Sequence, residues 1–215
     1  MAGLINNIQK IKEELSGRAE IVAASKARAA GEILEAIEGG ITIIGENYIQ
    51  EAEEKFNAIG KKVKWHLIGS LQKNKVKRAV RIFDMIETVD SFEIADAIDR
   101  ACAGTGRVMP VLIEINSGKE KNKSGVMPEE AEELVKRILE LKNIKIEGLM
   151  TMGPLLLAAE DYRPYFKNTK QLFDKIKSSA DMKYLSMGMS GSYRVAAQEG
   201  ANLVRIGTAI FGPRP

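Results

Sequence analysis

"VMPVLIEIN" (108–116), "PEEAEELVKRILELK" (128–142) and "IKIEGLMTM" (144–152) follow one another in the middle of the chain. The first and third segments are short apolar runs of the kind that form buried strands. Between them, apolar residues recur at helical spacing, and Pro128 is expected to start the helix. These apolar residues are Ala131, Leu134, Val135, Ile138 and Leu141. A strand, a helix and a second strand in this order predict one crossover unit of an α/β protein.

The same alternation continues on both sides of this unit. Further strand-like runs occupy 20–25, 41–45, 63–69, 83–88, 183–187 and 201–207. Helical patterns occupy 91–103 and 164–179, and an additional helix, roughly 2–15, precedes the first strand. Eight strands alternating with helices predict a (β/α)8 TIM barrel with an extra N-terminal helix. The alternative is an open doubly wound sheet, whose usual G-x-G-x-x-G turn is missing after the first strand.

The composition limits the classes of function. The 215 residues suit one compact domain, and a net charge of +3 is too mild to indicate nucleic-acid binding. The single cysteine, Cys102, excludes an internal disulfide and indicates a reducing compartment. Charges occur too early in 1–15 for a signal peptide, and no apolar run approaches the roughly 18 residues of a membrane span. We therefore expect a soluble cytoplasmic protein without membrane partners.

Polar residues follow several of the predicted strands, at the end where barrel enzymes carry their active sites. Lys26 ends the apolar run of "IVAASKAR" (21–28), either as a solvated strand end or as an amine within reach of a ligand. Ser190 lies in "SMGMSGS" (186–192), just before the helix-like "YRVAAQEG" (193–200). A serine there caps a helix or, together with exposed amides, binds an anion.

Gly207 and Thr208 follow the eighth strand, which is the other half of the usual phosphate position in these barrels. A lysine amine near a bound phosphate compound is suited to Schiff-base formation with an aldehyde. Arg205 lies on the eighth strand, where a charge facing the barrel interior needs a ligand or an acid. An arginine facing a pyridine nitrogen is one way in which proteins tune pyridoxal phosphate. His66 is the only histidine, which disfavours multi-histidine metal sites, and we interpret it as structural or as a support for residues that contact a ligand.

Seven segments together resemble the pyridoxal 5′-phosphate homeostasis protein family, the single-domain relatives of the alanine racemase barrel. They are "SK" (25–26), "GENYIQE" (45–51), "WHLIGSLQKNK" (65–75), "KSG" (123–125), "GLMTM" (148–152), "LSMGMS" (185–190) and "VRIGTAIFG" (204–212). They occur in the family's order and cover almost the whole chain, so the resemblance implies one alanine-racemase-like TIM-barrel domain over residues 1–215.

The resemblance also implies a cofactor site. Pyridoxal 5′-phosphate would form a Schiff base with Lys26, and Arg205 would face its pyridine nitrogen. Its phosphate would be held by Ser190, Gly207 and Thr208. The remaining contacts implied are Asn47 beside the ring, with His66 and Met150 lining the pocket.

Two positions depart from the family pattern. Ser192 stands where the family usually has aspartate, a change at the helix cap that predicts slightly weaker phosphate binding. "ARAAG" (27–31) replaces the family's threonine and proline-containing turn, so we expect a differently positioned first loop.

Family members are thought to buffer or deliver the cofactor, and the partners implied are pyridoxal phosphate and apoenzymes that depend on it. The alternatives are an amino-acid racemase with the same cofactor and a Schiff-base aldolase acting on a phosphosugar. Racemisation needs an acid/base group on each face of the substrate, and related racemases take a tyrosine from a second, β-rich domain. The sequence continues only three residues past Gly212, so we expect no such domain and, by default, a monomer that is not an enzyme.

Overall fold

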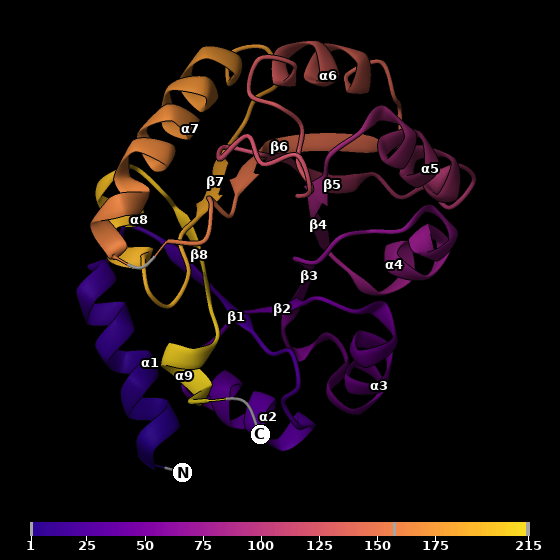
Figure 1. The fold of residues 1–215 in the computed structure, drawn as a ribbon. Coiled ribbons are helices and arrows are strands. Elements are labelled where there is room, and N and C mark those ends of the chain that lie inside the picture. Colours follow the sequence, from indigo (N-terminus) through magenta and orange to yellow (C-terminus); the bar gives the residue numbers. More distant parts are fainter. Residues whose placement is uncertain (1, 157, 214–215) are drawn as a thin grey trace.

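The computed structural model describes residues 2–156 and 158–213, and it contains a closed barrel of parallel strands surrounded by helices (Figure 1). The strands are β1 (Glu20–Ala24), β2 (Ile43–Glu46), β3 (Lys64–Leu67), β4 (Met85–Val89), β5 (Met109–Ile115), β6 (Ile144–Thr151), β7 (Tyr184–Met187) and β8 (Leu203–Ile206). The α-helices are α1 (Ala2–Leu15), α2 (Ala30–Glu38), α3 (Ile49–Ile59), α4 (Val76–Ile82), α5 (Phe92–Cys102), α6 (Ala131–Ile138), α7 (Arg163–Ile176), α8 (Tyr193–Gln198) and α9 (Thr208–Phe211). Short 3₁₀ turns are η1 (Gly60–Lys62), η2 (Lys73–Lys75) and η3 (Ala159–Tyr162).

The predicted TIM barrel is confirmed. Each strand pairs in parallel with the next, and β8 pairs with β1 in the register Val22↔Arg205, which closes the sheet. An open doubly wound sheet would leave β1 or β8 at an edge, so that alternative is wrong. The extra N-terminal helix is α1, which packs beside α2, α8 and α9 (Figure 1). Its side chains Ile8, Ile11 and Leu15 are buried.

The helix predicted over 128–142 is shorter at both ends than expected. α6 covers Ala131–Ile138, and Pro128 lies in the preceding turn, in which the Glu130 amide donates to the Met127 carbonyl at 2.9 Å. Proline suits the second position of such a turn as well as the first turn of a helix, and here the turn prevails. The Leu139 amide still bonds four residues back, to Val135, whereas the amides of Glu140 and Leu141 bond three residues back, so the α-helix ends at this point.

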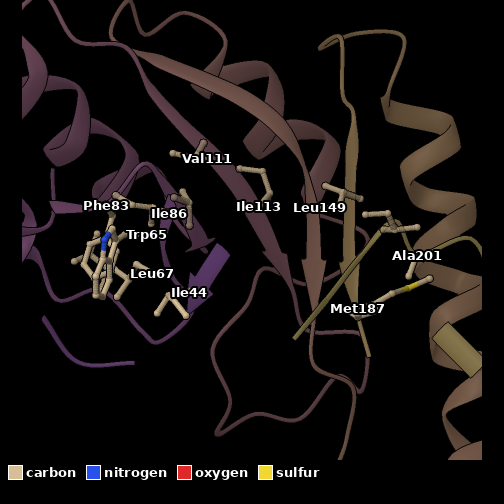
Figure 2. Packing of buried hydrophobic residues seen from close by; sticks show 14 of the residues in the cluster. Ile44, Trp65, Leu67, Phe83, Ile86, Val111, Ile113, Leu149, Met187 and Ala201 are labelled. Atoms are coloured by element: carbon tan, nitrogen blue, oxygen red, sulfur yellow. The ribbon is translucent and has the colours of Figure 1, made fainter. Parts of the chain in front are cut away.

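The main core lies between the strands and the helices, and Figure 2 shows a part of it. Trp65, Phe83 and Ile86 are fully buried there, and the Trp65 indole donates to the Gly60 carbonyl at 2.9 Å. Burying one such side chain contributes roughly 1.5–3 kcal/mol. A smaller cluster inside the barrel, which includes Val22 and Met150, leaves the carboxyl ends of the strands open for polar groups.

Among the helices that the structure describes, none has the length and apolar character to cross a membrane.

Candidate functional site

A cavity of about 270 Å³ lies at the carboxyl end of the barrel. Six residues predicted from the sequence line it: Lys26, Asn47, Ser190, Arg205, Gly207 and Thr208. They come from the ends of β1, β2, β7 and β8, far apart in the sequence. The structure therefore brings most of the predicted site together in one place.

His66 and Met150 do not line this cavity. His66 is 4% exposed and Met150 is fully buried, and both lie on strands β3 and β6. Met150 belongs to the apolar cluster inside the barrel, while His66 takes part in a polar network described below. The methionines that line the cavity are Met152, two residues further along the chain, and Met189 in the loop after β7.

Ser190 joins the loop after β7 to the start of α9. Its hydroxyl oxygen accepts the amide N–H groups of Gly207 and Ala209, at 3.3 and 3.2 Å. Because the oxygen serves as acceptor for both amides, its own hydrogen is left to donate into the cavity. Gly207 suits this position, since an added Cβ would come within 3.2 Å of the Ala24 carbonyl. The arrangement leaves the Ser190 hydroxyl, with Thr208 in the same lining, as a donor for an anion at one end of the cavity.

The serine expected to cap the helix after β7 behaves differently from the prediction. Ser192 stands at the N-cap of α8, but its hydroxyl accepts the Met189 amide at 3.2 Å and makes no capping bond to the helix. Ser190 instead stabilises the beginning of a different helix, α9. A loop-closing bond was available to Ser192 because the Met189–Ser192 segment forms a tight turn.

Lys26 extends into the cavity beside Tyr48. Its amine lies 3.1 Å from the Tyr48 hydroxyl and 4.6 Å from the centre of the tyrosine ring. Tyr48 is 51% exposed, so the amine is placed at the mouth of the barrel and not in its interior. The solvated strand end and the ligand-facing amine are thus both compatible with its surroundings.

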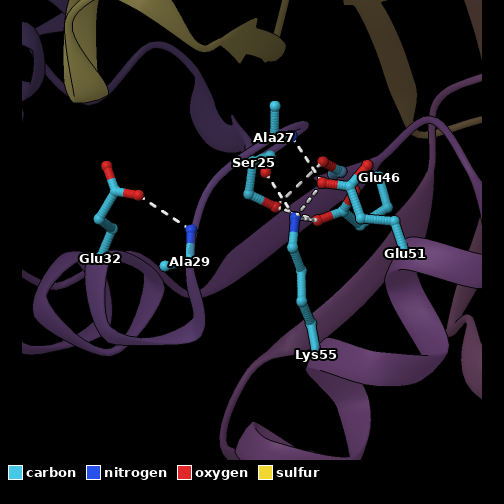
Figure 3. A network of polar contacts seen from close by, with 8 residues as sticks. Ser25, Ala27, Ala29, Glu32, Glu46, Glu51 and Lys55 are labelled. Carbon is cyan, nitrogen blue, oxygen red and sulfur yellow. Dashed lines mark hydrogen bonds and ion pairs between the residues drawn. The ribbon is translucent and has the colours of Figure 1, made fainter. Parts of the chain in front are cut away.

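The turn that carries Lys26 is held from below by Lys55 (Figure 3). The Lys55 ammonium donates to the Ser25 carbonyl and to Glu46, both at 2.6 Å, and to Glu51 at 2.7 Å. Glu51 in turn accepts the Ala27 amide at 2.6 Å. The residues on both sides of Lys26 are therefore fixed by one buried cation and its two carboxylates.

This network also explains the backbone at Ala27, which has a φ of 60°. A non-glycine residue in this region costs of order 1–3 kcal/mol, which the hydrogen bond to Glu51 helps to offset. Burial raises the pKa of Glu46, and the hydrogen bonds from Lys55 and Ser25 oppose that effect. The loop after β2 is also constrained, because Gly69 after β3 packs against it so closely that an added Cβ would lie 2.3 Å from the Asn47 carbonyl.

Arg205 belongs to a buried chain of polar groups that crosses the barrel. Its guanidinium donates to the Ser186 hydroxyl at 2.6 Å and to the Thr151 carbonyl at 2.8 Å. Ser186 donates to Glu87 at 2.6 Å, and the other Glu87 oxygen lies 2.7 Å from His66 Nδ1. Burial would raise the pKa of Glu87, but His66, Arg205 and Ser186 outweigh it and hold the pKa below its usual range. Arg205 is thus oriented and partly neutralised while it still lines the cavity.

Sequence analysis did not identify Arg28 as part of the site. Its guanidinium lines the cavity and donates to the carbonyls of Gly212 and Pro213, at 2.6 and 2.7 Å. These bonds tie the segment after α9 to the turn after β1. Glu32 pairs with the same guanidinium at 3.3 Å, but the two carbonyls that define this role lie more than 180 residues away, so no local pattern signals it.

Comparisons with known proteins bear on the family and the fold. The family model "Alanine racemase, N-terminal domain" matches residues 1–215. The pyridoxal phosphate homeostasis protein of Aquifex aeolicus (strain VF5) is 40% identical over 221 residues, covering 100% of this chain and 96% of that protein. The protein of the same name from Schizosaccharomyces pombe is 34% identical over 211 residues, covering 96% and 89%.

Two solved structures are also similar. PipY of Synechococcus elongatus PCC7942, with PLP bound, is 31% identical, with a TM-score of 0.89 and coverage of 97% of this chain and 100% of PipY. An alanine racemase of Clostridium difficile 630 is 20% identical, with a TM-score of 0.82, and this chain covers 60% of it. The likeness to the racemase shows the barrel fold alone.

Proposed function

Because the chain belongs to the pyridoxal phosphate homeostasis protein family, built on the alanine racemase N-terminal domain, we propose that it binds pyridoxal 5′-phosphate in the cavity at the barrel mouth. Lys26 holds the cofactor as a Schiff base, and the protein takes part in storing the cofactor or delivering it to apoenzymes. One observation carries this proposal: a primary amine, an anion-binding group of donors and a buried guanidinium line the same cavity.

The donor set fits the cofactor. The hydroxyl groups of Ser190 and Thr208 supply neutral donors suited to a phosphate, the amides of Gly207 and Ala209 hold the Ser190 oxygen in place, and Gly207 leaves room for the phosphate to approach. When bound, the cofactor supplies an aldehyde that condenses with a primary amine, and Lys26 is the lysine that lines the cavity in the described chain. Asn47 presents a carboxamide to the same space, without a side-chain hydrogen bond to any described residue.

Arg205 favours a carrier over a racemase. Its charge is held in place by Ser186 and the Thr151 carbonyl, so a guanidinium and not a carboxylate faces the cofactor cavity. A cation in that position disfavours protonation of a pyridine nitrogen and weakens the electron sink that carbanion chemistry uses.

Tyr48, which lies beside Lys26, does not provide a second acid/base group for racemisation. Its hydroxyl is paired with the Lys26 amine at 3.1 Å, and no tyrosine is among the described residues that line the cavity. Racemisation needs a proton-transfer group on each of two opposite faces, so this lining favours a carrier. Reversible binding of the cofactor at an accessible barrel mouth needs neither group as a catalyst.

The test is the visible absorption spectrum of the purified protein with added pyridoxal phosphate. We expect a yellow Schiff-base band in the wild type that is lost in Lys26→Ala. The control is Lys61→Ala, which removes an exposed lysine from the turn before β3 and keeps the band.

Two results would overturn the proposal. If the wild type shows no band, the phosphosugar aldolase becomes the better hypothesis. If Lys26→Ala retains the band, the cofactor attaches to another amine. Delivery has its own measurement: the loaded protein is mixed with a cofactor-dependent apoenzyme, and failure to restore that enzyme's activity under mild conditions counts against a carrier.

A further inference from the structure

A second cavity lies beside the one that holds Lys26. It has a volume of about 350 Å³, and its walls include Glu114, Asn116 and Lys123 from β5 and the loop after it. Met152 lines both cavities and forms the wall between them. Its side chain is 44% exposed and unbranched, so this wall is adaptable. A molecule in the second cavity is therefore a direct neighbour of the first.

Glu114 is an acid without a partner at the base of this second cavity. Its side chain is 7% exposed, and within residues 2–156 and 158–213 no hydrogen bond or ion pair reaches its carboxyl group. Burial raises the pKa of Glu114 to about 7, with the Asp90 charge raising it further and Arg205 opposing. A buried carboxyl group of this kind costs stability unless something else satisfies it.

Two of the neighbouring polar groups that line the cavity, Asn116 and Lys123, are already engaged. The Asn116 carboxamide donates to the Glu120 carbonyl at 2.9 Å and to the Lys123 carbonyl at 3.5 Å. The Lys123 ammonium lies 2.6 Å from a carboxylate oxygen of Glu120. The cation that the chain itself places at this cavity is therefore paired elsewhere, and Glu114 is left to face a ligand.

The chemistry of one carboxyl group selects the class of ligand. A calcium ion takes six to eight oxygen ligands, and the described residues contain no group of three or more histidine, cysteine or acidic side chains suited to a metal. An organic ammonium ion needs a single carboxylate and an apolar surface for its carbon atoms, which Met152 and Ile115 provide. We propose that the second cavity binds the ammonium group of a small primary amine, with Glu114 as its counter-ion.

This site goes beyond cofactor binding, because it identifies a second ligand and its chemical class. An amine held against Met152 lies beside the cavity of Lys26, where any amine that replaces the lysine on the cofactor must arrive. That use of the site rests on the proposed function, whereas binding of the ammonium ion does not.

The experiment is an NMR titration of the ¹⁵N-labelled, cofactor-free protein with ethylammonium chloride, referenced to equal sodium chloride. We expect saturable shifts of the amides of 115–118 and 151–153 in the wild type. Glu114→Gln should raise the dissociation constant for ethylammonium at least tenfold. A charge-assisted hydrogen bond is worth about 1.5–3 kcal/mol, and each 1.4 kcal/mol changes a dissociation constant tenfold. Glu129→Gln, which alters an exposed acid paired with Lys119, should bind as the wild type does.

The proposal is overturned if the wild type shows no saturable shifts at these amides, or if Glu114→Gln binds ethylammonium as well as the wild type. The visible band with pyridoxal phosphate is recorded on the same samples. A missing band with intact ammonium binding refutes cofactor binding alone, and an intact band without ammonium binding refutes this site alone. Amide spectra that match the wild type show that the variants are folded.

Discussion

Replacing Glu114 by glutamine should stabilise the cofactor-free protein at alkaline pH. In the unfolded chain this carboxyl group loses its proton near pH 4.5, whereas in the folded protein its pKa is about 7. Between these values the unfolded state is ionised while the folded state still holds the proton. Stability therefore falls as pH rises from about 4.5 to about 7 and is level above that, and glutamine removes this loss.

The size of the effect follows from the two pKa values. Each pKa unit corresponds to about 1.4 kcal/mol, so the rise from 4.5 to about 7 is worth about 3 kcal/mol at pH 8.5. For a chain of 215 residues this predicts a melting temperature about 6–12 °C higher in Glu114→Gln. At pH 5.0 the difference should be below about 1 kcal/mol, because this pH lies only slightly above the pKa of the unfolded chain and little of the loss has accumulated.

The assay is thermal unfolding of wild type and Glu114→Gln at pH 5.0 and 8.5, followed by circular dichroism. The charged groups that act on Glu114 are Asp90 after β4 and Arg205 on β8, with Lys123 at the rim of the same cavity. Equal differences at both pH values would refute the reasoning, and so would a variant less stable than the wild type at pH 8.5. Either result would mean that Glu114 is ionised and well solvated in the folded protein.

Two further substitutions test how the fold positions the site. Lys55→Met leaves Glu46 and Glu51 without their cation and should lower the free energy of unfolding by about 3–5 kcal/mol, measured by urea titration. Adding Glu46→Gln should recover part of this loss. A single variant as stable as the wild type would contradict the network. Gly148→Ala places a Cβ 1.8 Å from the Tyr184 carbonyl and should cost more than about 2 kcal/mol by separating β6 from β7, while Gly3→Ala meets no atom within 4 Å and should not destabilise.

The strands were the most predictable part of the fold. Each is a short apolar run, and burial on both faces of a barrel sheet leaves that pattern in the sequence without help from distant residues. The end of a helix depends on local competition instead. Pro128 satisfies both a turn and a helix start, and only the bond between Glu130 and Met127 shows which one forms.

The candidate site was predictable where a residue's position on a strand implied its role. Arg205 stood out as a charge on an apolar strand, and Glu114 in "VLIEIN" carried the same signal, which was missed. Lys55 had no such signal, because a lysine on a helix usually faces water. Its partners Ser25 and Glu46 lie 30 and 9 residues away, and only the folded barrel brings them together.

The polar groups at the barrel mouth fall into two classes: groups that position other residues, and groups that face a cavity where a ligand can bind. Lys55 and the Arg205 chain have partners within the protein, so their bonds fix the turn of Lys26 and the orientation of the guanidinium. Glu114 and Asn47 face cavities without a hydrogen bond from their side chains to any residue in the described part of the chain. Unsatisfied polar groups lower stability, so ligand binding is the physical reason to retain them at this end of the barrel. The two proposals thus assign neighbouring ligands to the barrel mouth, an anion-bearing aldehyde at Lys26 and an ammonium ion at Glu114.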